Sequence, residues 1–364
     1  MTLNRVVITT GGTGGHIFPA LAVATELVLR NKGVDVLFVG GPGPEGDMAR
    51  KFGLRFVELP ASGIMGRGIP GILSAIGWVG TAVPRAIATI WRFKPEVVIG
   101  FGGYAGFCPV LAAWMLGKPT AVHEQNSVPG VTNKVLGNLV KRIFLSFRDN
   151  TVAFPVSKTT LTGNPVRLDI FKAAERRQSR ITGKRVLVLG GSQGAKPIND
   201  AIIEGLPKLM EAGVTLVHQA GKADYTRVRA AYEAAGADSA QVHEFIEDMG
   251  TEYASCDLAI CRSGATTVFE IAAAGVPAIF VPFPHATHDH QTMNATAMSD
   301  LGAAKLIPQS VLTGDMLAHA ACRLLDDEKR LKDMEEAARQ FAKPNAAADI
   351  VSGLESLVTQ GRGV

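Results

Sequence analysis

The feature that most constrains the fold of this chain is a strand that runs into a glycine-rich turn, and this feature occurs twice. An apolar run at residues 5–10 leads into the turn at residues 11–15, and a similar run at residues 184–189 leads into the turn at residues 190–195. Open α/β sheets bind ligands at such turns, beyond the carboxyl ends of their strands. The repeat predicts an α/β protein with two Rossmann-like domains, whose parallel sheets face each other across a ligand-binding cleft.

The same repeat suggests the domain bounds. We expect a first domain over residues 1–163 and a second over residues 164–344, with the joint at the turn signal of residues 163–165. A last helix within residues 345–364 carries an apolar stripe on one face. The stripe consists of Ile350, Val351, Leu354, Leu357 and Val358. It must pack on one of the two domains, and we expect it to complete the first.

Residues 256–295 predict a strand, a helix, a second strand and a loop. Ser263 and Gly264 end the first strand, and the helix over residues 265–274 stops at Gly275. The free N–H groups and the positive dipole end of such a helix suit a phosphate. Glu270, one to two turns further on, is placed to accept both hydroxyls of a ribose. The alternative is an ordinary βαβ unit with a serine cap and a solvated glutamate.

Composition restricts the setting in which the protein works. With 364 residues, 47% of them hydrophobic, the chain can fill two cores. The four cysteines have no metal-binding spacing and indicate thiols of a reducing compartment. The N-terminus enters a strand without the pattern of a secretion leader, so we expect a cytoplasmic protein.

The charge is unevenly distributed along the chain. Residues 1–163 hold 16 Lys and Arg against 8 Asp and Glu, a balance of +8, whereas the remainder hold 21 against 25, a balance of −4. The first domain therefore faces an anionic partner, either nucleic acid or an acidic membrane surface. Aromatic residues make up 6% of the chain and are not interleaved with the basic residues, which weighs against nucleic acid.

Two uncharged stretches are long enough to raise the question of a membrane span. Residues 97–117 fit a strand, a glycine loop and a buried helix better than a span. Residues 68–84 are too short and too interrupted by glycine and proline to cross a bilayer. They are apolar enough to lie on a membrane surface, between Arg67 and Arg85. The alternative is that their apolar side chains belong to the core.

Several blocks that occur in order make the chain resemble a known family. They are GGTGGHIFPALAVA (residues 11–24), GGYAG (102–106), HEQN (123–126), TGNPVR (162–167), GGSQGA (190–195), CRSGATTVFEIAAAGVPAIFVPFP (261–284) and DHQTMNA (289–295). Together they resemble the MurG family of bacterial N-acetylglucosaminyltransferases, within glycosyltransferase family 28. The resemblance covers nearly the whole chain.

The resemblance implies a metal-independent, cofactor-free GT-B enzyme at the cytoplasmic face of the bacterial inner membrane, attached peripherally. It would transfer GlcNAc from UDP-GlcNAc to the 4-hydroxyl of MurNAc in undecaprenyl-pyrophosphoryl-MurNAc-pentapeptide, turning lipid I into lipid II with inversion. The partners so implied are UDP-GlcNAc, lipid I and an anionic membrane surface, and not nucleic acid.

The resemblance also implies site residues. The donor would be held by Arg167, Ser192, Ile246, Ala265, Thr266, Thr267, Val268, Phe269, Glu270 and Gln291. From the first domain, Thr13, Gly14, Gly15 and Asn126 would close over it. Some relatives carry a second glutamine beside the one that matches Gln291, where this chain has His290 and Thr292. The exact sugar contacts around Gln291 therefore stay open.

The reaction needs a base for the acceptor hydroxyl, and two residues compete for that role. His16 and Glu124 both follow strands of the first domain, and an imidazole titrates near neutral pH. His16 could instead bond only the loop backbone, and Glu124 could orient the acceptor. Tyr104, in the third glycine loop, is a further candidate for substrate contact or a packing aromatic.

Other classes of protein are disfavoured by particular residues. A nicotinamide-dependent oxidoreductase needs an acidic residue at the end of its second strand, whereas Asp35 lies at the start. A non-catalytic nucleotide-sugar or membrane-surface binding module needs neither His16 nor Glu124 beside the cleft. His285, His288, Asp289 and His290 resemble a zinc cluster, but no ligand from elsewhere in the chain is apparent, so we expect no metal there.

Overall fold

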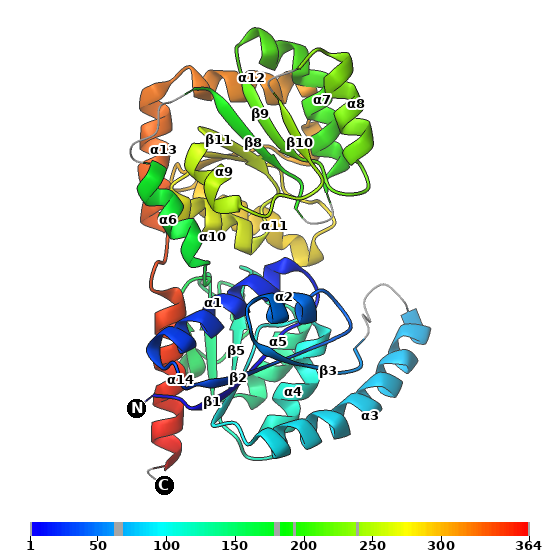
Figure 1. The fold of residues 1–364 in the computed structure, drawn as a ribbon, viewed down its shortest axis with the longest axis vertical. Helices are drawn as coiled ribbons and strands as arrows, with labels where there is room; N and C mark the ends of the chain where they lie inside the picture. The colour runs from blue at the N-terminus through cyan, green and yellow to red at the C-terminus, as the bar shows by residue number, and fades with distance from the viewer. Residues whose placement is uncertain (1, 62–67, 178–182, 192–193, 238–239, 363–364) are drawn as a thin grey trace. The chain divides into compact units, whose positions relative to one another are not determined.

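The chain folds as two compact units. The computed structural model describes residues 2–61, 68–177, 183–191, 194–237 and 240–362, without the side chains of residues 68–76, 287 and 362. The first unit comprises Met1–Arg167 and Lys343–Val364, and the second comprises Leu168–Ala342 (Figure 1). The chain thus passes into the second unit after Arg167, a few residues beyond the turn at residues 163–165.

The first unit is built on a parallel sheet. Its strands are β1 (Arg5–Thr9), β2 (Asp35–Gly40), β3 (Arg55–Glu58), β4 (Val97–Gly100), β5 (Thr120–Glu124), β6 (Arg142–Leu145) and β7 (Thr159–Leu161). They lie in the order β3-β2-β1-β4-β5-β6-β7. Because β1, β4 and β5 are neighbours and parallel, the loops that follow them meet at one edge of the sheet.

Helices cover both faces of this sheet. They are α1 (Gly14–Arg30), α2 (Glu45–Lys51), α3 (Gly68–Phe93), α4 (Tyr104–Met115), α5 (Val131–Leu139) and α14 (Ala346–Arg362). Side chains alternate along β1, so that Val6 and Ile8 pack with α1 and α14, while Val7 packs with α3, α4 and α5. The apolar stripe of α14 belongs to the first of these clusters, and α14 lies beside α1 (Figure 1).

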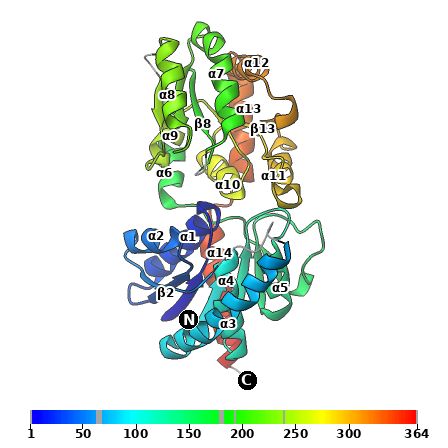
Figure 2. The same cartoon turned by 90° about the vertical axis from the view of Figure 1, so that its right-hand side faces the viewer.

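The second unit repeats this plan. Its strands are β8 (Arg185–Leu189), β9 (Thr215–Gln219), β10 (Gln241–His243), β11 (Leu258–Cys261), β12 (Ala278–Phe280) and β13 (Ala304–Leu306), in the order β10-β9-β8-β11-β12-β13. Its helices are α6 (Leu168–Arg177), α7 (Lys196–Glu211), α8 (Tyr225–Ala234), α9 (Met249–Ser255), α10 (Ala265–Ala274), α11 (His290–Ser299), α12 (Gly314–Leu325) and α13 (Glu328–Phe341). Helices α7, α8 and α12 share one core cluster, whereas α10 packs against α6 and α13 (Figure 2).

Three elements differ from the sequence expectation. The sequence predicts a helix from about Pro19 to Arg30, but helix α1 begins at Gly14, inside the glycine turn, so that Pro19 lies within it. Strand β5 runs on through His123 and Glu124, which we expected in the loop. Helix α3 is continuous from Gly68 to Phe93 despite its glycines and Pro84, because Ala82, Ala86 and Ile90 pack one face of it into the core.

Other expectations are confirmed. Residues 97–117 form β4, a glycine loop and the buried helix α4. Three cysteines are buried and Cys322 is half-buried, and all four are free. Among the helices of the described residues, none is both long and apolar enough to span a bilayer.

Candidate active site

The loops after β1 and β4 touch at the carboxyl edge of the first sheet. Gly103 adopts φ 74°, and a Cβ built on it would lie 2.1 Å from the carbonyl oxygen of Gly11. No side chain fits at that distance, and the left-handed φ also favours glycine. Gly103 therefore permits the contact that gathers the loops around the first turn of α1.

His16 lies in this first turn and is half-buried. Its Nδ1 atom is 2.8 Å from Oε1 of Gln125, in the loop after β5. A Cβ on Gly102, which has φ 83°, would lie 3.4 Å from Cε1 of His16. Within the described part of the chain, Nε2 of His16 has no hydrogen-bond partner. This nitrogen is therefore the atom that a substrate hydroxyl can meet.

Glu124 has a different environment, because its carboxylate is engaged by its own loop. It is 2% exposed and accepts hydrogen bonds from the backbone N–H groups of Asn126 and Gly130, each at 3.0 Å. Nδ2 of Asn133 donates a further bond at 2.9 Å. With both oxygens occupied, Glu124 holds the loop after β5 in shape and is less well placed than His16 to accept a proton.

The other candidates of the first unit gather around the same edge. Thr13 is the N-cap residue of α1, where its side chain makes no capping bond, and Gly14 and Gly15 form the first turn. Tyr104 is the first residue of α4, and Asn126 lies two residues after Glu124; both are half-buried. The structure thus brings together the first-unit residues that the sequence singled out.

Arg167 is the last residue of the first unit. Its guanidinium lies over the ring of Phe18 in α1, 4.5 Å from the ring centroid. The sequence had placed it at the start of the second domain. Stacking on Phe18 fixes the side chain beside the helix that carries His16.

In the second unit, the N-terminus of α10 is held by α11 and not by a serine cap. The N-cap residue is Gly264. The hydroxyl of Ser263 donates to the backbone oxygen of Gln291 at 2.8 Å, and Nδ2 of Asn294 donates to the Ser263 carbonyl at 3.2 Å. Helix α10 spans Ala265–Ala274 and ends on Gly275 at φ 67°, as the sequence predicts. The first turn of a helix has backbone N–H groups without partners inside the helix, which is the general basis for anion binding at this position.

Glu270 is not the solvated glutamate of the alternative interpretation. It is 7% exposed and accepts a hydrogen bond from the Tyr253 hydroxyl at 3.3 Å. The side chains of Val268 and Phe269, two further donor candidates, are 0% and 2% exposed. The ring of Phe269 packs on Phe341. Successive helix residues point in different directions, so the side chains of residues 265–270 do not all lie on one side of the helix.

The sequence reasoning missed two glutamines that connect neighbouring strand ends. Gln219, at the end of β9, donates from Nε2 to the Gly191 carbonyl at 3.1 Å and accepts from the Ile246 N–H at 2.9 Å. It thereby joins the loops after β8 and β10, the two strands that flank β9. Gln125 plays a similar part after β5. A signal was present, since each glutamine stands at a strand end one or two residues after a histidine, at His218-Gln219 and at His123-Glu124-Gln125.

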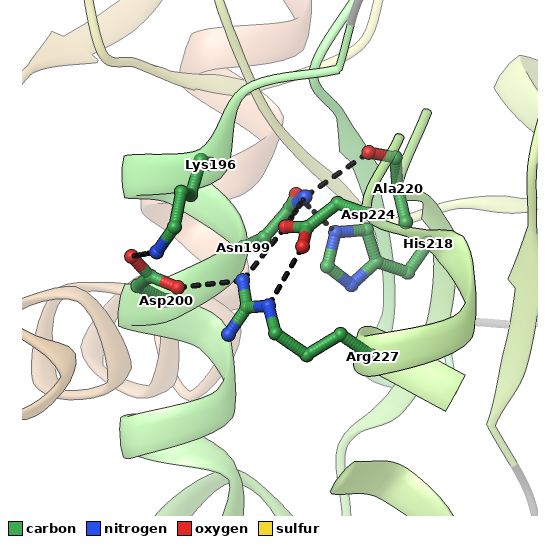
Figure 3. Close-up of polar contacts among 7 residues, drawn as sticks. All are labelled: Lys196, Asn199, Asp200, His218, Ala220, Asp224 and Arg227. Atoms are coloured by element: carbon green, nitrogen blue, oxygen red, sulfur yellow. Dashed lines mark hydrogen bonds and ion pairs between the residues drawn. The ribbon is translucent and has the colours of Figure 1, made fainter. Parts of the chain in front are cut away.

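A polar network fixes the loop after β9 to α7 (Figure 3). Asn199 donates to the Ala220 carbonyl at 3.0 Å and to Asp224 at 2.7 Å, while its Oδ1 lies 2.9 Å from His218 Nε2. Burial lowers the pKa of His218 to about 3, so its ring is neutral. Hydrogen bonds from Arg227 lower the pKa of Asp224 to about 2. This arrangement makes the loop rigid where it meets the β8 turn.

The remaining candidates are Ser192, Ile246 and Gln291. Ser192 lies outside the described residues. Ile246 is buried, and its N–H donates to Gln219. Gln291 is the second residue of α11, and its Oε1 accepts from the Phe283 N–H at 3.0 Å. Gln291 and the start of α10 thus lie together. In the described ranges, His, Cys, Asp and Glu side chains form no group of three that could hold a metal ion.

Comparison with known proteins places the chain in a family. Residues 6–145 match the glycosyltransferase family 28 N-terminal domain, and residues 185–350 match the glycosyltransferase family 28 C-terminal domain. The chain belongs to glycosyltransferase family 28. Both matches cover the strands that carry the candidate site.

Individual family 28 relatives match along the whole chain. A protein of Solidesulfovibrio magneticus is 52% identical, with 97% of each chain covered, and one of Myxococcus xanthus is 41% identical, with 99% of this chain and 95% of the relative covered. Both are named UDP-N-acetylglucosamine–N-acetylmuramyl-(pentapeptide) pyrophosphoryl-undecaprenol N-acetylglucosamine transferase. The crystal structure of Acinetobacter baumannii MurG superposes with a TM-score of 0.77 at 34% identity, covering 97% of this chain and 99% of that one.

Proposed function

We propose that this protein is an inverting glycosyltransferase that moves GlcNAc from UDP-GlcNAc to the 4-hydroxyl of MurNAc in undecaprenyl-pyrophosphoryl-MurNAc-pentapeptide. The reaction turns lipid I into lipid II in peptidoglycan biosynthesis. The observation that carries the proposal is a half-buried imidazole whose Nε2 is open at the edge of the sheet, in a chain whose relatives bear the name of this transferase. Transfer of labelled GlcNAc to a lipid I analogue tests it.

In the proposed reaction, the acceptor oxygen attacks the anomeric carbon while Nε2 of His16 takes the hydroxyl proton. The bond from the anomeric carbon to the UDP oxygen breaks, and UDP leaves with that electron pair. The N–H groups at the start of α10 and the guanidinium of Arg167 meet the charge on the diphosphate. Attack opposite the leaving group inverts the anomeric centre.

For the donor, we propose contacts with Ser192, Ile246, residues 265–269 in the first turns of α10, Glu270 and Gln291. The carboxylate of Glu270 is proposed to accept from both ribose hydroxyls. From the first unit, the turn at Thr13, Gly14 and Gly15, together with Tyr104 and Asn126, is proposed to contact the sugars.

Glu270→Ala is expected to raise the KM for UDP-GlcNAc by about 10–150-fold and to lower kcat much less. The corresponding loss of binding free energy is about 1.5–3 kcal/mol, typical of hydrogen bonds to a charged group. Steady-state kinetics with a lipid I analogue measure both constants. Tyr253→Phe is the matched control, because it removes only the hydroxyl that bonds Glu270 inside the protein. An unchanged KM in Glu270→Ala, or an equal rise in Tyr253→Phe, contradicts the ribose role.

We propose further that the enzyme docks peripherally on the cytoplasmic face of the inner membrane through the first unit. Trp91 of α3 is 65% exposed, and Trp114 and Met115 at the end of α4 are 46% and 55% exposed. Helices α3 and α4 pack side by side, and neither contains an acidic residue. The basic residues Arg85, Arg92 and Lys94 are exposed beside them.

This α3–α4 surface combines aromatic and basic groups, which suits an anionic bilayer. Aromatic side chains insert at the headgroup level, and each nearby Lys or Arg adds about 1 kcal/mol of attraction. The sequence had pointed to residues 68–84, whose first part, including Ile72 and Ile76, lies outside the described side chains. The exposed aromatics lie further along α3 and on α4.

The double variant Trp91→Glu, Trp114→Glu is expected to lose most co-sedimentation with vesicles that contain anionic lipid, while UDP binding is retained. Leu301→Glu, at a residue of the second unit that is 52% exposed, is the matched control and is expected to sediment like the wild type. Equal sedimentation of the double variant and the wild type would exclude the α3–α4 surface as the docking site.

A further inference from the structure

The amide of Gln125 lies between two histidines that neighbouring elements bring together. Its Oε1 is 2.8 Å from Nδ1 of His16, and its Nε2 is 3.0 Å from Nδ1 of His123. The same Nε2 is 3.0 Å from the carbonyl oxygen of Phe101, in the loop after β4. Gln125 is 1% exposed, so water does not replace these partners. One amide thus connects β5, the β4 loop and the first turn of α1.

The contacts fix which way the amide points. The Phe101 carbonyl can only accept a hydrogen bond, so the atom that faces it must be the NH₂ group. The same NH₂ group lies 3.3 Å from the carbonyl oxygen of His123, a second group that can only accept, and 3.0 Å from Nδ1 of His123. Nε2 of His123 lies 3.2 Å from the Gly163 carbonyl and 3.4 Å from the Ser146 hydroxyl. Hydrogen on Nε2 satisfies the Gly163 carbonyl in a neutral ring. Its burial agrees, since it lowers the pKa of His123 to about 4.

The two carbonyl oxygens that face Nε2 of Gln125 fix the orientation of the amide, so that Oε1 faces His16. Because Oε1 of Gln125 has no hydrogen, Nδ1 of His16 must donate to it. We infer that Gln125 is the positioning residue for His16, holding the ring hydrogen on Nδ1 and leaving the lone pair on Nε2 for the acceptor hydroxyl. The inference rests on the proposed function, in which His16 is the base. Carboxylates orient the catalytic histidine in serine hydrolases, whereas this site uses a neutral amide.

The tautomer can be observed without any enzymatic activity. In protein labelled with ¹⁵N-histidine, two-bond ¹H–¹⁵N spectra show which ring nitrogen carries the hydrogen, and the signals lost in His16→Ala identify His16. We expect hydrogen on Nδ1 in the wild type at neutral pH. Hydrogen on Nε2 overturns the inference. His218, held by Tyr232 and Asn199 in the second unit, is the internal control for folding.

The Gln125→Met variant removes the oxygen that accepts from His16 and keeps a side chain of similar size. We expect His16 to lose its preference for Nδ1–H and kcat to fall by roughly 10–100-fold, the effect of removing groups that orient functional histidines. The KM for UDP-GlcNAc is expected to change little. If His16→Ala abolishes transfer but Gln125→Met keeps both the tautomer and kcat, the inference is wrong and the transferase stands. If the wild type shows Nδ1–H but transfers no GlcNAc, the proposed function is wrong and the selection of the tautomer is upheld.

Gln125→Glu keeps an acceptor toward His16 but adds a negative charge. It is expected to retain Nδ1–H and to move the acid limb of the kcat/KM profile to higher pH, because the carboxylate stabilises the inactive imidazolium. The other ionisable groups on the elements around His16 are the same in both proteins; they include Glu26 and Arg30 of α1, Tyr104 and Cys108 of α4, His123 and Glu124 of β5, Lys134 of α5, and Arg167, which stacks on Phe18. A purely structural role for Gln125 would leave the pH profile in place, and an unmoved acid limb therefore contradicts the inference.

Discussion

His16→Ala is expected to lower kcat for GlcNAc transfer by roughly 10²–10⁴-fold, with UDP binding preserved. The reason is geometric: His16 is half-buried, Gln125 holds its Nδ1, and its Nε2 faces no group within the described residues. Steady-state kinetics with a lipid I analogue measure the loss, and a thermal shift with UDP checks that the variant folds.

Glu124→Ala is the comparison that separates the two candidate bases. Glu124 holds its loop through two backbone N–H groups and Asn133, so its removal is expected to weaken acceptor binding and to retain the acid limb of the pH profile. His16→Ala is expected to lose that limb. If Glu124→Ala abolishes turnover with the acceptor bound and His16→Ala does not, the roles are reversed.

Arg177→Leu is expected to destabilise the second unit by about 3–5 kcal/mol, the cost of breaking a buried charged network by removing one partner. The guanidinium is 1% exposed and pairs with Glu335 at 2.7 Å. It also donates to the carbonyl oxygens of Gly275, at 3.0 Å, and of Tyr253 and Cys256. It thereby fastens α6 to α9, α10 and α13. Its loss leaves the carboxylate and three carbonyls without these hydrogen bonds.

Urea unfolding followed by hydrogen exchange of peptides from residues 168–342 measures this effect, because the two units can unfold separately. Arg229→Leu is the matched control, since the Arg229–Glu233 pair is 59% and 63% exposed and exposed pairs contribute little. An Arg177→Leu midpoint as close to the wild type as that of Arg229→Leu would show that the network does not hold the second unit together.

The fold could be predicted from the sequence where residues such as glycine mark the end of an element locally. Helix α10 begins and ends at the predicted residues because Gly264 and Gly275 mark both ends. The same reasoning could not predict helix α3. Its glycines and Pro84 argue against a helix, yet burial of Ala82, Ala86, Ile90 and Phe93 outweighs their propensity. Tertiary packing of this kind is not visible in a window of sequence.

The candidate site could be predicted only as far as residue types and strand ends allow. His16, Glu124 and Glu270 were found because they are reactive side chains at the end of a strand or within the first two turns of a helix. Gln125 and Gln219 were missed because their roles depend on partners 109 and 27 residues away. The distinction between His16 and Glu124 likewise needed the hydrogen bonds around each. For Val268 and Phe269, the resemblance named two positions whose side chains the fold buries.

The most direct test of the central claim is transfer of radiolabelled GlcNAc from UDP-GlcNAc to a short-chain lipid I analogue by the purified protein. We predict a labelled disaccharide lipid with a β-linkage to the 4-hydroxyl of MurNAc, and no product with an analogue that lacks this hydroxyl. The release of UDP should match the label transferred. Hydrolysis of UDP-GlcNAc without transfer, or equal labelling of the analogue that lacks the 4-hydroxyl, would contradict the account.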